Sequence, residues 1–274
     1  MIKALVCIKS IPDLDQVVAG DWKYGSHLEE PDVGYANQII NNCDENAVEI
    51  LLRLRDDCRS RSEEVVIEAV TIGGLKSAGV LKEAYAIGVD RCVQIESTLD
   101  NRCNFQAMAA LLHAYIRKQD DYDIILCGES APPYENGQTA FVLAHLLGYL
   151  CVSDIRELTW AEGRYQAVSQ SDGVRCIVTP AGSFVGITGN ISGFKLRLPT
   201  LKERLQSGRK KIIKMTAEDL GLSEETLRHG GGKTLKRFFA EEVRKECQHL
   251  ELQTNPKDLK LLLTLLKNGC EKTI

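Results

Sequence analysis

The sequence of 274 residues has no excess of basic residues and no long apolar run. Its formal net charge is -4, so its overall charge gives no reason to expect nucleic acid as a partner. No apolar run approaches the length of about 20 residues that crosses a bilayer. The opening MIKALVCIKSIP has the pattern of a short strand rather than of a signal peptide. We therefore expect a cytoplasmic protein without membrane insertion.

Paired cysteines are also missing. The ten cysteines are scattered singly, without a C-x-x-C pair and without the Cys/His spacing of a zinc site. Several of them, including Cys7 and Cys127, lie within apolar runs. This pattern is typical of reduced, buried thiols in a cytoplasmic protein, and it predicts no metal site.

The short motifs of common nucleotide and hydrolase sites are absent as well. There is no G-x-G-x-x-G after the first apolar run, no G-x-x-x-x-G-K-[ST] and no G-x-S-x-G. These absences argue against a Rossmann dehydrogenase, a P-loop NTPase and an α/β-hydrolase. No paired carboxylates and no nucleophile with a base stand out. We interpret His113 and His145, which fall on predicted helices, as helix-face residues.

What the sequence does contain is an alternation of apolar runs and helical periodicity. In units of about 30 residues, this order is typical of βαβ repeats, and right-handed crossovers place helices on both faces of the sheet. The sequence predicts an α/β fold with a Rossmann-like, open, mostly parallel sheet. Asp44 is a candidate N-cap for the first helix. Strands are expected at residues 4–8, 65–72, 91–96 and 123–128, and helices at residues 44–57, 77–88, 104–119 and 136–148.

The pattern changes after residue 148. Turn signals at Glu162-Gly163 and Asp172-Gly173 separate alternating runs, which indicates hairpins, so we expect antiparallel strands to extend the sheet. Residues 195–214 are basic and irregular, and a helical pattern, DLKLLLTLLKN, lies near the end of the chain. We predict an α/β domain over residues 1–222 and a C-terminal helical arm over residues 223–274.

The stretch CGESAPPYENGQTAFVLAHLLG, residues 127–148, combines a strand end, a polar loop with glycine and a helix start. In an open parallel sheet, ligands bind at the carboxyl ends of strands, and a helix N-terminus attracts phosphate. Ser130, Gln138 and Thr139 could donate hydrogen bonds to phosphate oxygens. A tight turn between a strand and a helix requires a glycine whether or not a ligand binds there. A nucleotide site and a simple turn therefore both stay open as interpretations. Four strand ends are expected to converge: residues 9–10, 72–74, 95–96 and 128–130.

Four segments, taken together, resemble the β subunit of electron transfer flavoproteins. VCIKSIPD is similar to that family's V-K-x-V-P-D start, and INNCDENAVEILLRL to its N-P-x-x-E-x-A-V-E-x-A helix start. AVTIGGLKSAGVLKEAYAIGVDRCVQIE resembles its strand, glycine turn and A-x-x-x-G-A-D motif. LRLPTLKERLQSGRKKI matches R-Y-P-S-L-K-x-I-M-x-A-K-K-K-x-I in length and register, and is the most specific of the four. The resemblance runs from Met1 to about Leu222.

The resemblance implies an adenine nucleotide whose phosphate is held by the family's G-x-Q-A-x-D-x-D-x-x-Q-T-G loop. This sequence keeps Gly128, Ala131, Gln138 and Thr139, and departs from the pattern at residues 132–135 and at residue 140. Non-bifurcating members of the family hold AMP there, whereas bifurcating members hold a second FAD. The residues PYENGQT are closer to the non-bifurcating pattern, which favours AMP.

The same resemblance implies that Cys7, Asn41 and residues 71–73 line the adenosine. Asn41 could equally be a capping residue at the helix start. A shared FAD, held mainly by an α subunit, would be covered by this chain from near Leu14 and Cys43. The candidate cofactor-binding residues are therefore Cys7, Asn41, Cys43, Thr71, Ile72, Gly73, Gly128, Glu129, Ser130, Ala131, Asn136, Gly137, Gln138 and Thr139.

Residues 197–211 resemble the loop by which the family docks acyl-CoA dehydrogenases. Leu201 matches its apolar anchor, and basic residues surround it, a composition suited to a transient redox interface. Without the resemblance, a solvated basic turn is the simpler interpretation. The candidate docking residues are Arg197, Leu201, Lys202, Arg204 and Lys210.

Taken as a whole, the resemblance implies the β subunit of a heterodimeric electron transfer flavoprotein. Such a subunit carries electrons between a flavin dehydrogenase, acyl-CoA dehydrogenase-like, and a downstream acceptor, and it is not itself an acid-base catalyst. Terminal helices such as residues 259–266 would pack on the α subunit. Two alternatives stay open: a free-standing adenine-nucleotide sensor of the same architecture, and an interaction scaffold whose altered loop no longer binds nucleotide.

Overall fold

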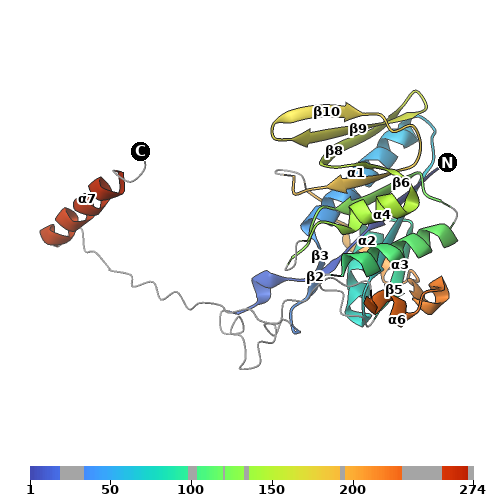
Figure 1. Ribbon diagram of the computed structural model, residues 1–274, viewed down its shortest axis with the longest axis horizontal. Coiled ribbons are helices and arrows are strands. Elements are labelled where there is room, and N and C mark those ends of the chain that lie inside the picture. The colour runs from blue at the N-terminus through green and yellow to red at the C-terminus, as the bar shows by residue number, and fades with distance from the viewer. Residues whose placement is uncertain are drawn as a thin grey trace. The chain divides into compact units, whose positions relative to one another are not determined.

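The chain forms two compact units in a computed structural model, Met1–Leu235 and Lys236–Ile274 (Figure 1). The structure describes residues 1–18, 34–97, 104–119, 121–132, 136–191, 195–229 and 255–270. The first unit contains an open sheet with helices on both faces, which confirms the α/β, Rossmann-like fold predicted from the sequence.

The main sheet has the strand order β12-β5-β4-β1-β6-β11-β7, and every neighbouring pair in it is parallel. The chain runs outward from β1 to β4 and β5, and then returns to β6 on the other side of β1. The strand order therefore switches between β1 and β6. The strands are β1 (Ile2–Cys7), β4 (Val65–Ile72), β5 (Arg91–Glu96), β6 (Ile124–Gly128), β7 (Leu150–Val152), β11 (Phe184–Thr188) and β12 (Ile213–Thr216).

Helices cover both faces of this sheet because its strands are apolar on both sides. Ala4 and Val6 of β1 belong to a core cluster shared with α1 (Asn42–Ser60) and α2 (Ala78–Ile87). Leu5, whose side chain points to the opposite face, belongs to a second cluster shared with α3 (Phe105–Lys118) and α4 (Thr139–Leu147), which lie side by side in Figure 1. Burial on both faces explains the uninterrupted apolar runs in the sequence.

The predicted hairpins are present. β8 (Ile155–Ala161), β9 (Arg164–Ser171) and β10 (Val174–Val178) are antiparallel, and both turn glycines have positive φ angles, 72° at Gly163 and 79° at Gly173. These strands do not extend the main sheet as expected, but form a sheet of their own, at the top of Figure 1. The reason is that Ile155 and Leu158 face α1 and join its core cluster, so this sheet packs on the helix instead of pairing with a strand edge.

Several short elements were missing from the sequence-based prediction. β2 (Ser10–Pro12) pairs with β3 (Gln38–Ile40) in a small antiparallel sheet. The stretch expected to be irregular, residues 195–214, contains α5 (Leu201–Ser207) and the start of β12. Three short 3-10 helices complete the loops, η1 (Leu14–Gln16), η2 (Leu75–Ser77) and η3 (Glu218–Leu220).

The first unit continues past residue 222, because α6 (Glu224–His229) contacts α3 and Leu227 is buried in the second core cluster. In the second unit, α7 (Pro256–Cys270) confirms the helix predicted from the pattern at residues 258–268. The division at residue 222 and a contact of the arm with an α subunit stay predictions. Among the described helices, none has both the length and the apolar character needed to cross a membrane.

Candidate functional site

A pocket of about 310 Å³ lies at the carboxyl ends of β1 and β6, where the strand order switches. The start of α1, the first turns of α3 and the segment between β6 and α4 complete its walls. This is the place where open parallel sheets bind ligands. The predicted site residues that line it are Cys7, Asn41, Ile72, Gly128, Glu129, Ser130, Ala131, Asn136, Gly137, Gln138 and Thr139.

Three predicted site residues lie outside the pocket lining: Cys43, Thr71 and Gly73. Gly73 has a local reason to be glycine, since a Cβ atom there would come within 2.3 Å of the Ser77 hydroxyl. The β1, β4 and β6 ends meet at the pocket, whereas the β5 end, residues 95–96, does not line it. Residues 133–135, where the loop departs from the family pattern, lie outside the described residues.

Two polar residues at the start of α1 have roles that the sequence did not indicate. The helix begins at Asn42, so the prediction of Asp44 as its N-cap is wrong. Asn41 occupies the N-cap position, but its side chain makes no capping hydrogen bond; instead, its Nδ2 donates to the carbonyl oxygen of Ser130 at 2.8 Å. Asn41 thus fixes the β6–α4 segment against α1.

Asp44 lies in the first turn of α1, and only 4% of its surface is exposed. Its carboxylate accepts a hydrogen bond from the backbone N–H of Lys9 at 2.7 Å and another from that of Gly128 at 2.9 Å. Burial raises the pKa of Asp44 to about 7, although these two bonds, the Asn41 side chain and the Lys9 charge oppose the shift.

Two thiols at or beside the pocket, those of Cys127 and Cys43, are held in their neutral form. A hydrogen bond with Cys7 and burial raise the pKa of Cys127 well above its ordinary value, and burial raises the pKa of Cys43. A protonated, buried thiol is a poor nucleophile and a poor metal ligand. Over the described ranges, no group of three or more His, Cys, Asp or Glu side chains is placed to hold a metal ion.

The pocket has a polar end and an apolar wall. At the polar end, α4 starts at Thr139 without a side-chain cap on its first N–H groups, an arrangement that suits an anion. Gly137, just before it, has a φ of 63°. Phe105 and Met108 of α3 form part of the apolar wall. The sequence did not identify these two residues, because periodicity shows a helix but not which of its residues borders a pocket.

The candidate docking residues divide into two groups. On and around α5, Leu201 is 74% exposed, and Lys202 and Arg204 are exposed as well. Arg197, by contrast, is paired within the chain, with Nε 3.0 Å from Glu49 and Nη1 2.9 Å from Asp56. Lys210 is also held internally, since its Nζ lies 4.7 Å from the centroid of the Tyr85 ring and donates to the carbonyl oxygen of Val89 at 3.4 Å.

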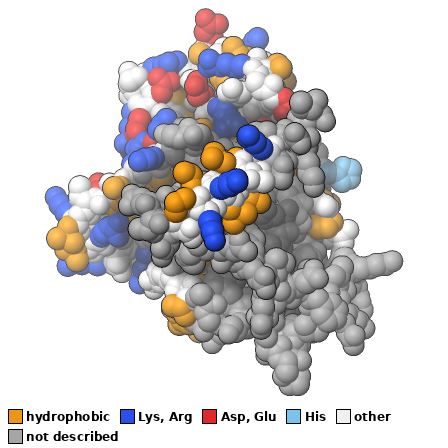
Figure 2. Space-filling view, turned by 90° about the vertical axis from the view of Figure 1, so that its left-hand side faces the viewer, with side chains coloured by type: hydrophobic (Ala, Val, Ile, Leu, Met, Phe, Trp, Pro, Cys, Tyr) orange, Lys and Arg blue, Asp and Glu red, His pale blue; other side chains and the backbone are white. Residues whose placement is uncertain are grey.

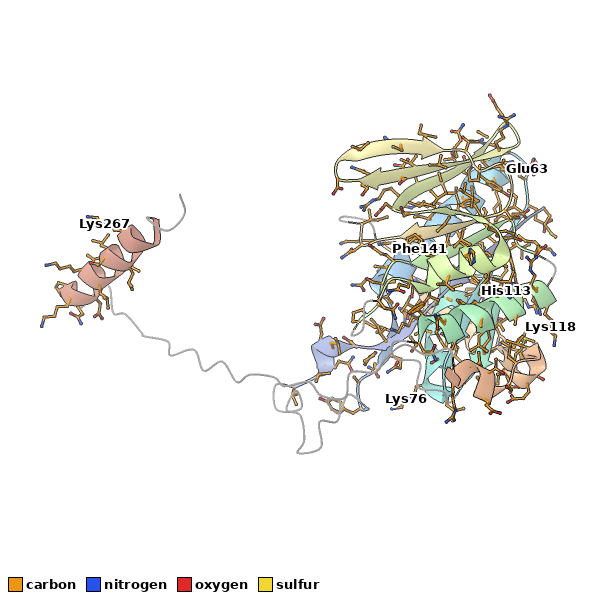
Figure 3. All side chains as sticks on the ribbon, viewed as in Figure 1. Glu63, Lys76, His113, Lys118, Phe141 and Lys267 are labelled. Atoms are coloured by element: carbon orange, nitrogen blue, oxygen red, sulfur yellow. The ribbon has the colours of Figure 1, made fainter. Side chains whose placement is uncertain are left out.

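The two histidines interpreted as helix-face residues lie on helices outside the pocket. His113, labelled in Figure 3, is on α3, and His145 is on α4. Burial and the charge of Arg117 lower the pKa of His113. Neither histidine is placed to act on a ligand in the pocket.

An open parallel sheet with a pocket at its switch point is the arrangement in which α/β proteins bind ligands. The family model "Electron transfer flavoprotein domain" matches residues 34–220. The electron transfer flavoprotein subunit beta of Bacillus subtilis (strain 168) is 31% identical over 237 residues, which cover 85% of this chain and 87% of the relative. The chain therefore belongs to the electron transfer flavoprotein family, as a divergent member similar to its β subunits, and the resemblance seen in the sequence is confirmed.

Two further relatives support this assignment. The electron transfer flavoprotein subunit beta of Megasphaera elsdenii is 26% identical over 239 residues, 85% of each chain. The putative electron transfer flavoprotein subunit YgcR of Escherichia coli (strain K12) is 24% identical over 217 residues, which cover 77% of this chain and 80% of the relative.

Proposed function

We propose that this chain is the β subunit of a heterodimeric electron transfer flavoprotein, carrying electrons between a flavin dehydrogenase and a downstream acceptor. The observation that supports it best is the pocket at the β1–β6 switch point in a chain of this family. The flavin supplies the redox chemistry when it is bound. The chain's own residues position a nucleotide, cover the flavin and present a docking surface.

The pocket residues fit an adenine mononucleotide. The apolar wall with Phe105 and Met108 suits a base, and the uncapped start of α4 suits a phosphate. The volume of about 310 Å³ is at the lower end of the range of about 300–1,000 Å³ for small-molecule sites, which favours AMP over a second FAD. In this proposal AMP is a structural ligand of the subunit.

The proposed partner is an α subunit that holds most of the shared FAD. One relative, 27% identical over 157 residues (57% of this chain and 56% of the relative), is the caffeyl-CoA reductase-Etf complex subunit CarD of Acetobacterium woodii, a subunit of a complex by name. Leu14 and Cys43 remain the positions from which this chain would cover the flavin. α7 offers a surface for the partner, because its leucines at 263, 265 and 266 are each more than half exposed.

The proposed docking surface for the dehydrogenase is α5 with the segment before it. Leu198, Leu201 and Leu205 are 87%, 74% and 66% exposed, and Lys202 and Arg204 lie among them in the chain. Exposed apolar anchors with a charged surround suit a transient interface. An acyl-CoA dehydrogenase-like flavoprotein is the proposed electron donor.

The experiment that tests the proposal is co-expression with an α-type subunit, followed by purification and identification of the released nucleotides by chromatography. We expect a heterodimer that releases FAD and AMP in equal amounts. Release of FAD alone, at two per heterodimer, would instead assign the chain to the bifurcating members. A chain that takes no partner and carries no flavin would contradict the proposal. In that case, bound ATP would favour a free-standing adenine-nucleotide sensor, and the absence of any nucleotide would favour an interaction scaffold.

A further inference from the structure

One carboxylate joins the two strand ends that border the pocket. Oδ2 of Asp44 accepts a hydrogen bond from the N–H of Lys9, just beyond β1, and Oδ1 accepts one from the N–H of Gly128, the last residue of β6. β1 and β6 are neighbours in the sheet, and all three residues line the pocket. Asp44 therefore bridges the β1–β2 segment and the β6–α4 segment just beyond the paired strands, where the Lys9 side chain also reaches the Ala131 carbonyl oxygen at 3.5 Å.

The close fit around this carboxylate shows that the contact is built into the fold. A Cβ atom on Gly128 would lie 2.1 Å from Oδ1 of Asp44 and 2.9 Å from Cβ of Cys43, so only glycine allows the approach. The neighbouring bond from Asn41 to the Ser130 carbonyl fastens the next part of the same segment. The start of α1 thus holds the β6–α4 segment at two successive points.

We propose that ionised Asp44 is a positioning residue, which holds the β1–β2 and β6–α4 segments at the spacing that a nucleoside monophosphate requires. The inference rests on the proposed function, because it takes AMP as the ligand of this pocket. Nothing in the inference needs Asp44 to touch the ligand, since it acts through the backbone of Lys9 and Gly128.

Protonation changes what Asp44 can do. An ionised carboxylate accepts on both oxygens, whereas a protonated one carries an O–H donor. That O–H group would point at one of the two backbone N–H groups. Because two donors cannot form a hydrogen bond with each other, the N–H group at one strand end would lose its acceptor. With a pKa of about 7, the change falls near neutral pH. The ionisable groups around Asp44 are Lys9, whose charge favours ionisation, and the neutral thiols of Cys43 and Cys127; Glu129, on the β6–α4 segment, is exposed.

The expected effect on affinity follows from the ionised fraction. At pH 6, one unit below a pKa of about 7, about a tenth of the Asp44 carboxyls are ionised. If only the ionised form holds the pocket in its binding conformation, the apparent Kd rises in inverse proportion to that fraction, by about tenfold. AMP affinity should therefore increase as the pH rises from 6 to 8.

The test is the affinity of the nucleotide-stripped heterodimer for AMP between pH 6 and pH 8, measured by calorimetry for the wild type, Asp44→Asn and Glu45→Gln. Glu45 is a half-buried acid of the same helical turn that does not line the pocket. The phosphate of AMP itself titrates near pH 6, but this effect is common to all three proteins. We expect Asp44→Asn to bind weakly at pH 8 and to lose the extra tenfold pH dependence, and Glu45→Gln to follow the wild type.

A second measurement needs no variant, in case Asp44→Asn does not fold. Adenosine carries no phosphate, so its own titration does not contribute near pH 7. Because binding favours ionised Asp44, the wild type should release protons when it binds adenosine at this pH. Calorimetry in buffers of different ionisation enthalpy measures this release. AMP binding with equal pH profiles for the wild type and Asp44→Asn, or adenosine binding without proton release, would overturn the inference and leave the proposed function standing. A wild type that binds no AMP at any pH would overturn the inference and the proposed AMP site, whereas the proposed electron-transfer role would fall only if the chain also took no partner and carried no flavin.

Discussion

Among single residues, Gly128 shows how closely the pocket is packed. Its substitution by alanine would place a Cβ atom 2.1 Å from Asp44 and displace the end of β6. We predict that Gly128→Ala lowers the free energy of unfolding by about 1–3 kcal/mol, the usual cost of overpacking, and weakens AMP binding. Thermal unfolding and calorimetry measure the two effects.

The matched control for Gly128 is Gly182, in the segment before β11, where a Cβ atom would meet nothing within 4 Å. Gly182→Ala should change stability by less than about 0.5 kcal/mol and leave AMP affinity as in the wild type. Equal behaviour of the two variants would show that the backbone of Gly128 does not approach Asp44 closely.

Arg197 is a second residue with a defined structural role, while the docking role suggested by the sequence stays a prediction. It donates from three nitrogens to Glu49 and Asp56, and the Glu49 side chain is only 5% exposed. Removing the guanidinium leaves a buried carboxylate with fewer partners. We predict that Arg197→Met destabilises the protein by about 1–3 kcal/mol at pH 7, whereas Arg175→Met, which breaks a pair with 61% of each side chain exposed, costs less than about 1 kcal/mol.

The pH dependence of the Arg197 effect follows from the pKa of Glu49. Burial alone would raise this pKa, but the hydrogen bonds from Arg197 and Arg53 outweigh it, and the pKa is lowered. A carboxyl with a lowered folded-state pKa stabilises the fold above its ordinary pKa of 4.5, and this contribution is lost as the pH falls through the lowered value. The difference between wild type and Arg197→Met should therefore shrink as the pH falls below 4.5, as urea unfolding at several pH values would show. A difference that does not change with pH would contradict the pairing.

Among the elements, those with many local signals were predicted well from the sequence, and those held by distant partners were not. β4 and β5 have the bounds expected from their apolar runs. β2, β3 and β12 were missed because three or four residues carry no periodicity, and each is stabilised by pairing with a strand far away in the chain.

The same distinction applies to the candidate site. The β6–α4 segment could be predicted to line a pocket, since a strand, a glycine and a helix start follow one another in the sequence. The roles of Asp44 and Phe105 could not be predicted, because they depend on how α1 and α3 pack beside β1 and β6. Thr71 and Gly73 were selected by resemblance and lie outside the lining.

The helix α5 has a signal that could have been found in the sequence. Thr200 and Glu203 form a capping box, in which the Thr200 hydroxyl accepts from the N–H of Glu203 and the Glu203 carboxylate accepts from the N–H of Thr200. We predict that Thr200→Ala increases amide hydrogen exchange in α5 about fivefold, as for the loss of an N-cap, while Thr226→Ala, in α6, leaves exchange in α5 unchanged. Unaltered exchange in Thr200→Ala would show that α2, which contacts α5, holds this helix without its cap.

For the whole molecule, the βαβ pattern predicts a parallel sheet but not the order of its strands. The position of β11 between β6 and β7 places residues 184–188 next to residues 124–128, and no local pattern encodes such a pairing. The placement of the small β8–β10 sheet could not be predicted either. A strand with alternating apolar and polar residues can bury its apolar face equally well against a helix or against another sheet. At the top of Figure 2, where this sheet lies, acidic and basic side chains occur together.

Docking to an electron donor involves the whole molecule, and a substitution of Leu201 tests the proposed docking surface. We predict that Leu201→Ala slows electron transfer from an acyl-CoA dehydrogenase-like donor by about fivefold or more, because an apolar anchor costs more than about 1 kcal/mol when truncated. Ile177→Ala removes an apolar side chain of similar exposure, 66%, from β10 and should leave the rate unchanged. Stopped-flow kinetics with the heterodimer measures both; equal rates in the two variants would show that α5 is not the docking surface.

The position of α1 between two sheets has a consequence for how the protein folds. Its first two turns are bonded to residues far along the chain: Asn46 donates to the carbonyl oxygen of Gly189, and the Cys43 carbonyl oxygen accepts from the Thr188 hydroxyl. Its outer side is covered by β8, from residues 155–161. The helix reaches its final surroundings only after more than a hundred further residues have been synthesised. Contacts between residues so far apart in sequence slow folding, so a nascent chain that ends before β11 would still lack these two bonds to the start of α1.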